Sequence, residues 1–230
     1  MATKKNYTKE IYKTREEWLS ARSIGGSDAA AICGRSKWKT PRDVYNNITN
    51  KEPKKEIKNA RMIEGTLAEP HIRALFELEH PEFKVTPPPK KGSWLFRRKD
   101  YPEITLTPDG LIEDLITGEK LGYECKDVEL RKREQKELWL NDTLPDEYYF
   151  QTLHYLVVKN DLDGVLLHAR LKFYSFDYNN EYTLDHIEER YYLIMRRDVV
   201  KDVEYLEKKE IAFVLYNLRL GKKPPMVIKL

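Results

Sequence analysis

The chain has 230 residues, enough for one well-filled core or at most two small ones. Hydrophobic residues make up 40% of it and charged residues 34%, and no run approaches the roughly 18 apolar residues that span a bilayer. The N-terminal residues lack the apolar stretch of a signal peptide, and two cysteines are too few for a disulfide framework, a structural zinc site or an iron–sulfur cluster, so we expect a cytoplasmic protein without a membrane partner.

The charge is distributed unevenly along the chain. The net charge is only +3, but residues 1–61 carry 15 lysines and arginines against 7 acids, so the rest of the chain is net acidic. A basic first quarter indicates either a face that binds a polyphosphate or a lysine-rich solvated surface.

The first third of the chain predicts helices. Residues 8–21 have the apolar spacing of a short amphipathic helix. A Gly-Gly turn follows, and the next helix is expected to stop at Gly34. Thr40 followed by Pro41 is typical of the start of another helix, and residues 50–58 predict an exposed linker.

Residues 59–79 predict a longer helix. Pro70 lies inside the pattern, so we expect a kink or a break there. The expected core contacts of this helix are Ile63, Leu67, Leu75 and Phe76.

The remaining chain alternates strands and helices. Strands are expected at 104–112, 121–128, 164–176 and near 181–187, with an edge strand before them and helices at 146–159 and 189–219. This order predicts a single α/β domain, 1–230, on a central mixed sheet flanked by helices. Its parts would be a basic helical N-terminal part (1–61), a core (62–188), and a C-terminal helix and tail (189–230).

Two acids and a lysine on neighbouring strands could carry chemistry. Glu124 and Lys126 lie two apart in a predicted strand and so share one face, and Asp109 ends the preceding strand. A hairpin would bring the two carboxylates together, which is unfavourable unless a cation neutralises them. Oxygen ligands on a strand pair suit Mg²⁺, and Lys126 could orient water or stabilise a phosphate, so the pattern suits phosphodiester hydrolysis.

The same pattern also arises by chance in a chain with 38 acids and 41 bases. Burying a strand Glu and a Lys without a purpose is costly, which favours a real site. For Glu69, on the predicted 59–79 helix, the alternative is a solvated helix face.

Five segments, in order, resemble the lambda exonuclease family, also called the YqaJ-type viral recombinase nucleases, of the PD-(D/E)XK superfamily. They are W-L-S-A-R-S-I-G-G-S-D-A-A-A-I-C-G (18–34), E-G-T-L-A-E-P (64–70), T-P-D-G-L-I (107–112), Y-E-C-K (123–126) and Y-Y-F-Q-T-L-H-Y-L (148–156). The resemblance implies a restriction-endonuclease-like core.

The resemblance also implies roles for individual residues. The metal-binding groups would be Asp109, Glu124, the backbone carbonyl of Cys125, and Glu69 from the preceding helix, with Lys126 as the catalytic lysine. Arg22 and Ser27 would hold the 5′-phosphate of the DNA, since a guanidinium can donate two parallel hydrogen bonds to a phosphate. Gln151 and Tyr155 would support the site, although Leu153 stands where family members often carry a second glutamine.

The segment 35–39 lies where the resemblance places a DNA-facing loop. Trp38, between basic residues, could stack on a base of a frayed pair. The alternative is a buried tryptophan that anchors the loop.

The family further implies a 5′→3′ exonuclease on linear double-stranded DNA that leaves 3′ single strands for recombination. It implies two Mg²⁺ ions, replaceable by Mn²⁺, a homotrimer, a single-strand annealing protein as partner, and a bacterial cytoplasm if the gene is carried by a phage. Two alternatives are an endonuclease or nickase of the same fold and a non-catalytic DNA-binding protein.

Overall fold

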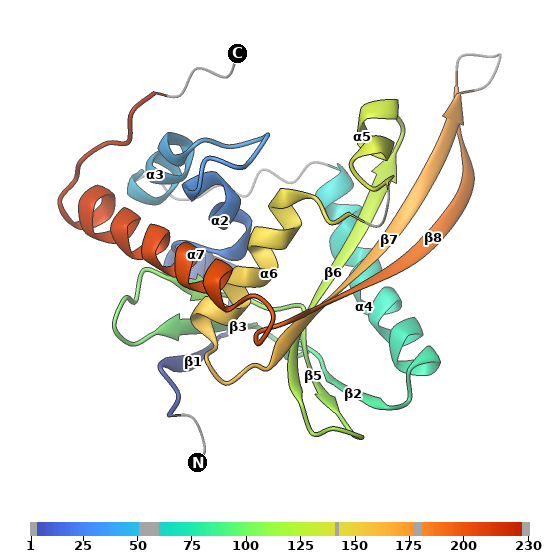
Figure 1. Ribbon diagram of the computed structural model, residues 1–230, viewed down its shortest axis with the longest axis horizontal. Coiled ribbons are helices and arrows are strands. Elements are labelled where there is room, and N and C mark those ends of the chain that lie inside the picture. The colour runs from blue at the N-terminus through green and yellow to red at the C-terminus, as the bar shows by residue number, and fades with distance from the viewer. Residues whose placement is uncertain (1–3, 51–59, 141–142, 177–180, 227–230) are drawn as a thin grey trace.

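Two β-sheets organise the fold in a computed structural model that describes residues 4–50, 60–140, 143–176 and 181–226 (Figure 1). The larger sheet has the order β2-β5-β6-β7-β8, and the smaller has the order β1-β3-β4. Within the larger sheet β6 and β7 are parallel and the other pairs antiparallel, which confirms the mixed sheet. The strands are β1 (Tyr7–Tyr12), β2 (Phe83–Thr86), β3 (Ser93–Arg98), β4 (Thr105–Leu106), β5 (Gly110–Asp114), β6 (Lys120–Leu130), β7 (Gly164–Phe176) and β8 (Tyr182–Met195).

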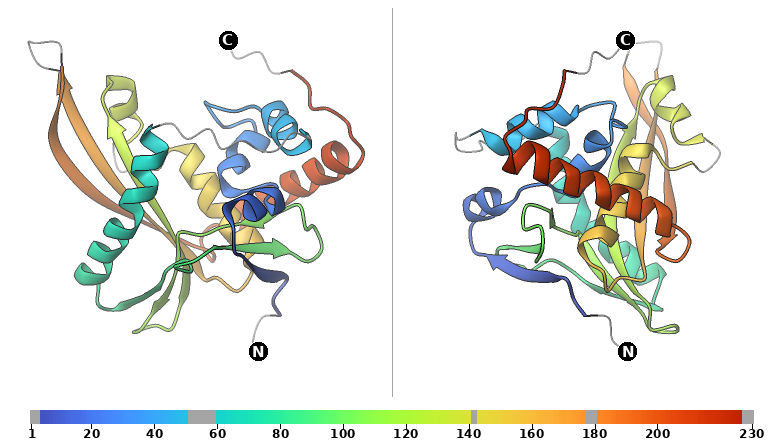
Figure 2. Two further views of the ribbon diagram at one scale, coloured as in Figure 1. Left: turned by 180° about the vertical axis from the view of Figure 1, so that it is seen from behind. Right: turned by 60° about the vertical axis from the view of Figure 1, so that its left-hand side comes forward.

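Helices cover the larger sheet on both faces, as Figures 1 and 2 show. On one face, Phe76 of α4 packs in a cluster with Tyr123 of β6. On the other, Leu156 of α6 packs with Val165 of β7. The helices are α1 (Arg15–Ala21), α2 (Gly26–Ile32), α3 (Pro41–Thr49), α4 (Ala60–Glu79), α5 (Arg133–Glu137), α6 (Asp146–Val158) and α7 (Val200–Ala212), which continues as a π-helix, η2 (Phe213–Arg219). None of the helices in the described ranges is long and apolar enough to cross a membrane.

The prediction of a helix over 8–21 is wrong in its first half. Tyr7–Tyr12 forms strand β1, paired antiparallel with β3 from Tyr7 opposite Arg98 to Tyr12 opposite Ser93. The helix begins only after Thr14, whose side chain accepts from the Glu17 N–H while Glu17 accepts from the Thr14 N–H. The apolar spacing and this capping box are local signals of a helix, whereas the strand depends on a partner far along the chain.

The other early elements follow the prediction closely. Gly34, with φ of 70°, lies just beyond α2, and Thr40 caps α3 with Pro41 in its first turn. The predicted linker at 50–58 lies, except for its first residue, outside the described residues.

Helix α4 is continuous through Pro70 and buries a different face from the one predicted. Phe76 is buried, but Ile63, Leu67 and Leu75 are exposed. Ile72 is buried instead. The apolar positions of this helix do not form one stripe, so the sequence pattern alone could not select the buried face.

The strand boundaries needed correction at two places. The predicted strand 104–112 is two strands, β4 and β5, in different sheets, because the chain changes sheet at 107–109. The predicted helix 189–219 begins only at Val200, since residues up to Met195 extend β8 along β7. β7 itself has the predicted bounds.

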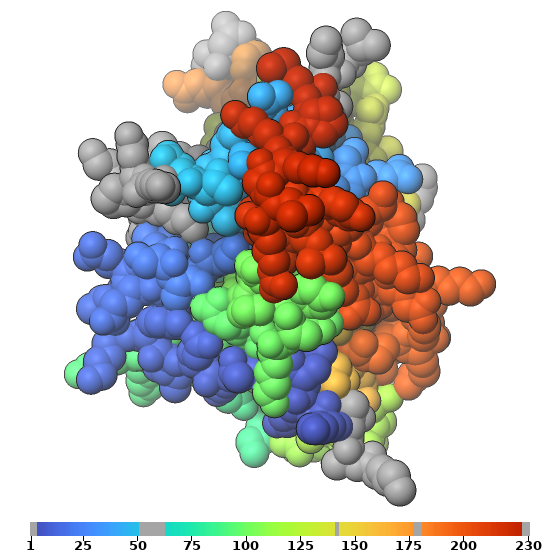
Figure 3. Space-filling view, turned by 90° about the vertical axis from the view of Figure 1, so that its left-hand side faces the viewer, coloured from blue at the N-terminus to red at the C-terminus, as the bar shows by residue number. Residues whose placement is uncertain are grey.

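N-terminal and C-terminal segments both contact the β3–β4 segment, drawn in green in Figure 3 between blue and red parts of the chain. Ile24 pairs with Ile104 in an isolated bridge. Arg219 binds Glu103 through two N–H···O contacts of 2.8 and 2.9 Å. Residues of α1 and α2 line one cavity with Asp109, which lies between β4 and β5.

Candidate active site

The predicted hairpin brings Asp109 beside the strand that carries Glu124. β5 starts at Gly110, which lies opposite Tyr123 of β6. The backbone N–H of Cys125 donates to Asp109 Oδ2 at 2.9 Å. Period two along β6 turns Tyr123 and Cys125 into the cluster beneath α4 and leaves Glu124 on the opposite face, toward α6.

The backbone around Asp109 is fixed by two side chains that sequence reasoning missed. Arg73 donates to the Asp109 carbonyl at 2.7 Å, and the indole of Trp94 donates to the Pro108 carbonyl at 2.9 Å. Arg73 lies one helical turn after Glu69 on α4, so the i, i+4 spacing from a predicted site residue was the one available signal.

Glu124 is the most constrained carboxylate of the site, at 3% exposure. Gln151 donates to its Oε1 at 2.6 Å, the Lys126 ammonium binds the same oxygen, and the Tyr155 hydroxyl donates to its Oε2. Gln151 and Tyr155 are four residues apart on α6 and therefore share one helix face. Leu153, on another side of the helix, is buried in the core.

The electrostatics of the site are those of crowded carboxylates around one ammonium. The pKa of Asp109 is raised well above its usual range, mainly by burial and to a smaller extent by the nearby Glu124 and Glu69. The pKa of Glu69 is raised likewise, mainly by burial and to a smaller extent by Glu124. Burial disfavours the charged form of Lys126, but Glu124 and Asp109 outweigh that effect and raise its pKa. An added cation would relieve the repulsion among the three acids.

The carboxylate oxygens of the site therefore fit a hard cation, although the three acids are not already arranged around one point. Across the described ranges, no three His, Cys, Asp or Glu side chains gather closely enough to make a metal cluster. Lys126, Gln151 and Tyr155 bind the carboxylate of Glu124, and the Cys125 N–H donates to one oxygen of Asp109. The metal roles of these acids and of the Cys125 carbonyl stay predictions.

The acids face a cavity of about 320 Å³ that also contains the predicted phosphate-binding residues. Arg22 Nη2 lies 3.4 Å from the Ser27 hydroxyl, to which it donates. The guanidinium groups of Arg15 and Arg22 lie 4.2 and 5.2 Å from the ring centroid of Trp18. Glu69, Asp109, Glu124, Gln151 and Tyr155 line the same cavity. Arg15, three residues before Trp18, was not predicted.

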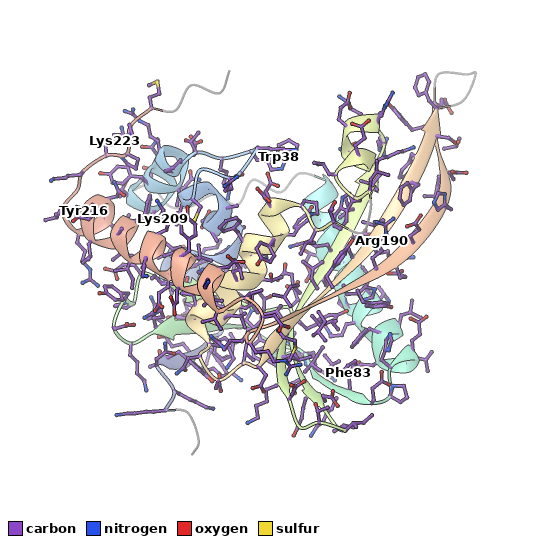
Figure 4. The ribbon with its side chains drawn as sticks, in the orientation of Figure 1. Trp38, Phe83, Arg190, Lys209, Tyr216 and Lys223 are labelled. Atoms are coloured by element: carbon purple, nitrogen blue, oxygen red, sulfur yellow. The ribbon has the colours of Figure 1, made fainter. Side chains whose placement is uncertain are left out.

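The loop at 35–39 presents its tryptophan to solvent. Trp38 is 79% exposed, so the alternative of a buried anchor is wrong. Figure 4 labels Trp38 at the tip of the loop between α2 and α3. Lys126, unlike the acids, lines a second cavity together with Trp38.

Residues 17–161 match the YqaJ-like viral recombinase domain, and the chain belongs to that family. A relative, the uncharacterized protein YqaJ of Bacillus subtilis (strain 168), is 31% identical over 147 residues, which cover 63% of this chain and 42% of that protein. The chain thus spans less than half the length of this curated relative.

Two solved structures resemble the fold. The crystal structure of LHK-Exo in complex with dAMP matches with a TM-score of 0.52 and 18% identity, covering 90% of this chain and 99% of the other. A crystal structure of an alkaline exonuclease (LHK-Exo) from Laribacter hongkongensis matches with a TM-score of 0.48 and 18% identity over 90% and 98% of the two chains. The first of these confirms the predicted fold.

Proposed function

We propose that this protein is a metal-dependent nuclease that degrades one strand of linear double-stranded DNA in the 5′→3′ direction and leaves 3′ single-stranded ends. The observation that carries the proposal is the convergence of Asp109, Glu124 and Glu69 on one cavity, with Lys126 bound to Glu124. Membership of the viral recombinase family and a fold like that of an exonuclease support it.

In this proposal Asp109, Glu69, Glu124 and the Cys125 carbonyl hold Mg²⁺, in two sites, with Mn²⁺ as a substitute. Bound there, Mg²⁺ would supply a Lewis acid and a water of lowered pKa. The ammonium of Lys126 brings positive charge to the face of β6 that a phosphate would meet.

Gln151 and Tyr155 act as positioning residues for the carboxylate. They donate to different oxygens of Glu124 and so set the plane of its carboxyl group. Arg22 and Ser27, which line the same cavity, would bind a terminal 5′-phosphate, and Arg15 adds a second guanidinium to that lining. These groups would select DNA with a phosphorylated 5′ terminus.

The test is digestion of three DNAs with Mg²⁺: end-labelled linear duplex with 5′-phosphate, end-labelled linear duplex with 5′-hydroxyl, and a closed circle without a label. Loss of label from the 5′-phosphorylated duplex with an intact circle is expected. Rapid nicking of the circle would instead identify an endonuclease. DNA binding without cleavage of any substrate would identify a non-catalytic binding protein.

Variants connect the activity to the site. Asp109→Ala and Lys126→Ala should abolish hydrolysis while the far-ultraviolet circular dichroism stays that of the parent. An active, folded Asp109→Ala protein would remove the proposed site.

The homotrimer and the single-strand annealing partner belong to the same proposal. Light scattering of the purified chain and co-purification with an annealing protein would test them.

A further inference from the structure

A hollow lined by strands of both sheets is separate from the catalytic cavity. It measures about 620 Å³, within the range of small-molecule sites, and we call it the Lys159 pocket. Its lining comes from β1 and β3 of the smaller sheet, from β2, β5 and β6 of the larger sheet, and from the segment after α6. Among the described residues, none lines both this pocket and the cavity that contains Asp109 and Arg22.

A buried ammonium, that of Lys159, belongs to the lining of this pocket. The residue is only 4% exposed, and its Nζ donates to the Tyr7 hydroxyl at 2.6 Å and to Asp161 Oδ1 at 3.1 Å. An ammonium has three N–H groups, and within the described ranges no third acceptor is present. Burial lowers the pKa of Lys159, and Asp161 offsets that effect only in part. A bound anion would accept the remaining N–H and stabilise the charged form.

The Lys159 pocket carries a surplus of positive charge. Its charged lining consists of four lysines and two acids: Lys5, Lys9, Lys120, Lys159, Glu113 and Asp161. The two acids are also shared, because Asp161 Oδ2 lies 3.5 Å from Lys5 Nζ and Glu113 Oε2 lies 3.9 Å from Lys84 Nζ, which is outside the lining. A phosphate monoester, with a charge of about −1.5 to −2 at pH 7, would balance the surplus of two positive charges.

The rest of the lining is mainly apolar. It consists of Phe96, Leu111, Ile112, Leu121 and Leu162, with the Thr86 hydroxyl as a further polar group. Inorganic phosphate has no apolar surface to bury against this wall, whereas an organic phosphate ester has. The combination of ammonium groups and an apolar wall therefore favours an organic phosphate.

We infer that the Lys159 pocket binds a small organic phosphate of the nucleoside monophosphate class. The phosphate would lie among the lysines, and the sugar and base would lie against the apolar wall, with Thr86 and Glu113 available to their polar atoms. The inference does not depend on the proposed function, because none of the residues assigned to hydrolysis or to binding of the DNA 5′-phosphate lines this pocket.

Calorimetric titration tests the pocket with three probes: thymidine 5′-monophosphate, thymidine and inorganic phosphate. The buffer contains EDTA, so that no metal ion supports binding in the catalytic cavity. Thymidine 5′-monophosphate should bind about tenfold more tightly than either other probe, since it alone can use both the lysines and the apolar wall. The double variant Lys9→Ala with Lys120→Ala should bind it about tenfold more weakly and should no longer distinguish it from thymidine. Both lysines are exposed, so the variant should stay folded, which circular dichroism checks.

Lys208→Ala is the matched control, because Lys208 is an exposed lysine of α7 outside the lining. Its affinity for thymidine 5′-monophosphate should equal that of the parent protein, as should that of Arg22→Ala. No binding by the parent protein, or equal affinity of the parent and the double variant, would overturn the inference. Loss of binding in Arg22→Ala would place the nucleotide in the catalytic cavity and overturn it too. A double variant that loses affinity for duplex DNA but not for the nucleotide would likewise overturn it, and all these outcomes leave the proposed hydrolysis intact.

Discussion

A fully buried ion pair joins α6 to α7 and provides a test of the packing behind the site. His154 Nδ1 lies 2.6 Å from Glu210 Oε1, and His154 Nε2 lies 2.8 Å from the Thr105 carbonyl oxygen. The Thr105 carbonyl can only accept, so Nε2 carries a proton. With Glu210 as a carboxylate, Nδ1 carries a proton as well, and His154 is then an imidazolium. Burial lowers the pKa of His154, but the charge and hydrogen bond of Glu210, together with the hydrogen bond to the Thr105 carbonyl, raise it above its usual value.

Replacing one partner of this pair should lower the free energy of unfolding far more than replacing both partners. His154→Leu or Glu210→Met alone leaves a buried charge unpaired, and breaking such a pair typically costs about 3–5 kcal/mol. Glu210 Oε2 is buried without a hydrogen-bond partner among the described residues, so the pair is imperfectly satisfied. The double replacement His154→Leu with Glu210→Met should therefore lie within about 1–2 kcal/mol of the parent protein.

Urea unfolding followed by circular dichroism measures these free energies for the parent, both single variants and the double variant. The expected result is strong non-additivity, with the double variant more stable than either single variant. If the losses of the single variants simply add in the double variant, the two side chains do not interact as a charged pair, and the reasoning is refuted.

Three further predictions follow from the structure. Because the pKa of His154 is raised above its unfolded value of about 6.5, its stabilisation should be complete below that pH and fall as pH rises through the raised pKa, which urea midpoints from pH 6 to 9 would show. Gly122→Ala would place Cβ 2.4 Å from the Tyr155 ring and should cost about 1–3 kcal/mol, whereas Gly65→Ala on α4 meets nothing within 4 Å and should not destabilise. Arg22→Ala should lose the preference for 5′-phosphorylated over 5′-hydroxyl ends, and unchanged rate ratios would exclude Arg22 from end binding.

Local rules predicted the elements whose signals lie within a few residues. The Thr40 cap with Pro41 placed α3, strict alternation placed β7, and period two put Glu124 and Lys126 on one strand face. The pairing of β5 with β6 followed from their proximity along the chain, and with it the approach of Asp109 to Cys125.

Other features depended on partners distant in the chain. Strand β1 exists because β3, more than eighty residues later, offers it hydrogen bonds, and local propensity cannot register that partner. Arg73 of α4 can donate to the Asp109 carbonyl only once α4 packs beside residues 107–109. Trp38 likewise lines the second cavity only once the α2–α3 loop and α6 come together. Backbone periodicity follows from neighbouring residues, whereas burial and site geometry depend on which surfaces meet. The sequence therefore predicted the residue types of the candidate site, and the packing of distant segments sets what surrounds them.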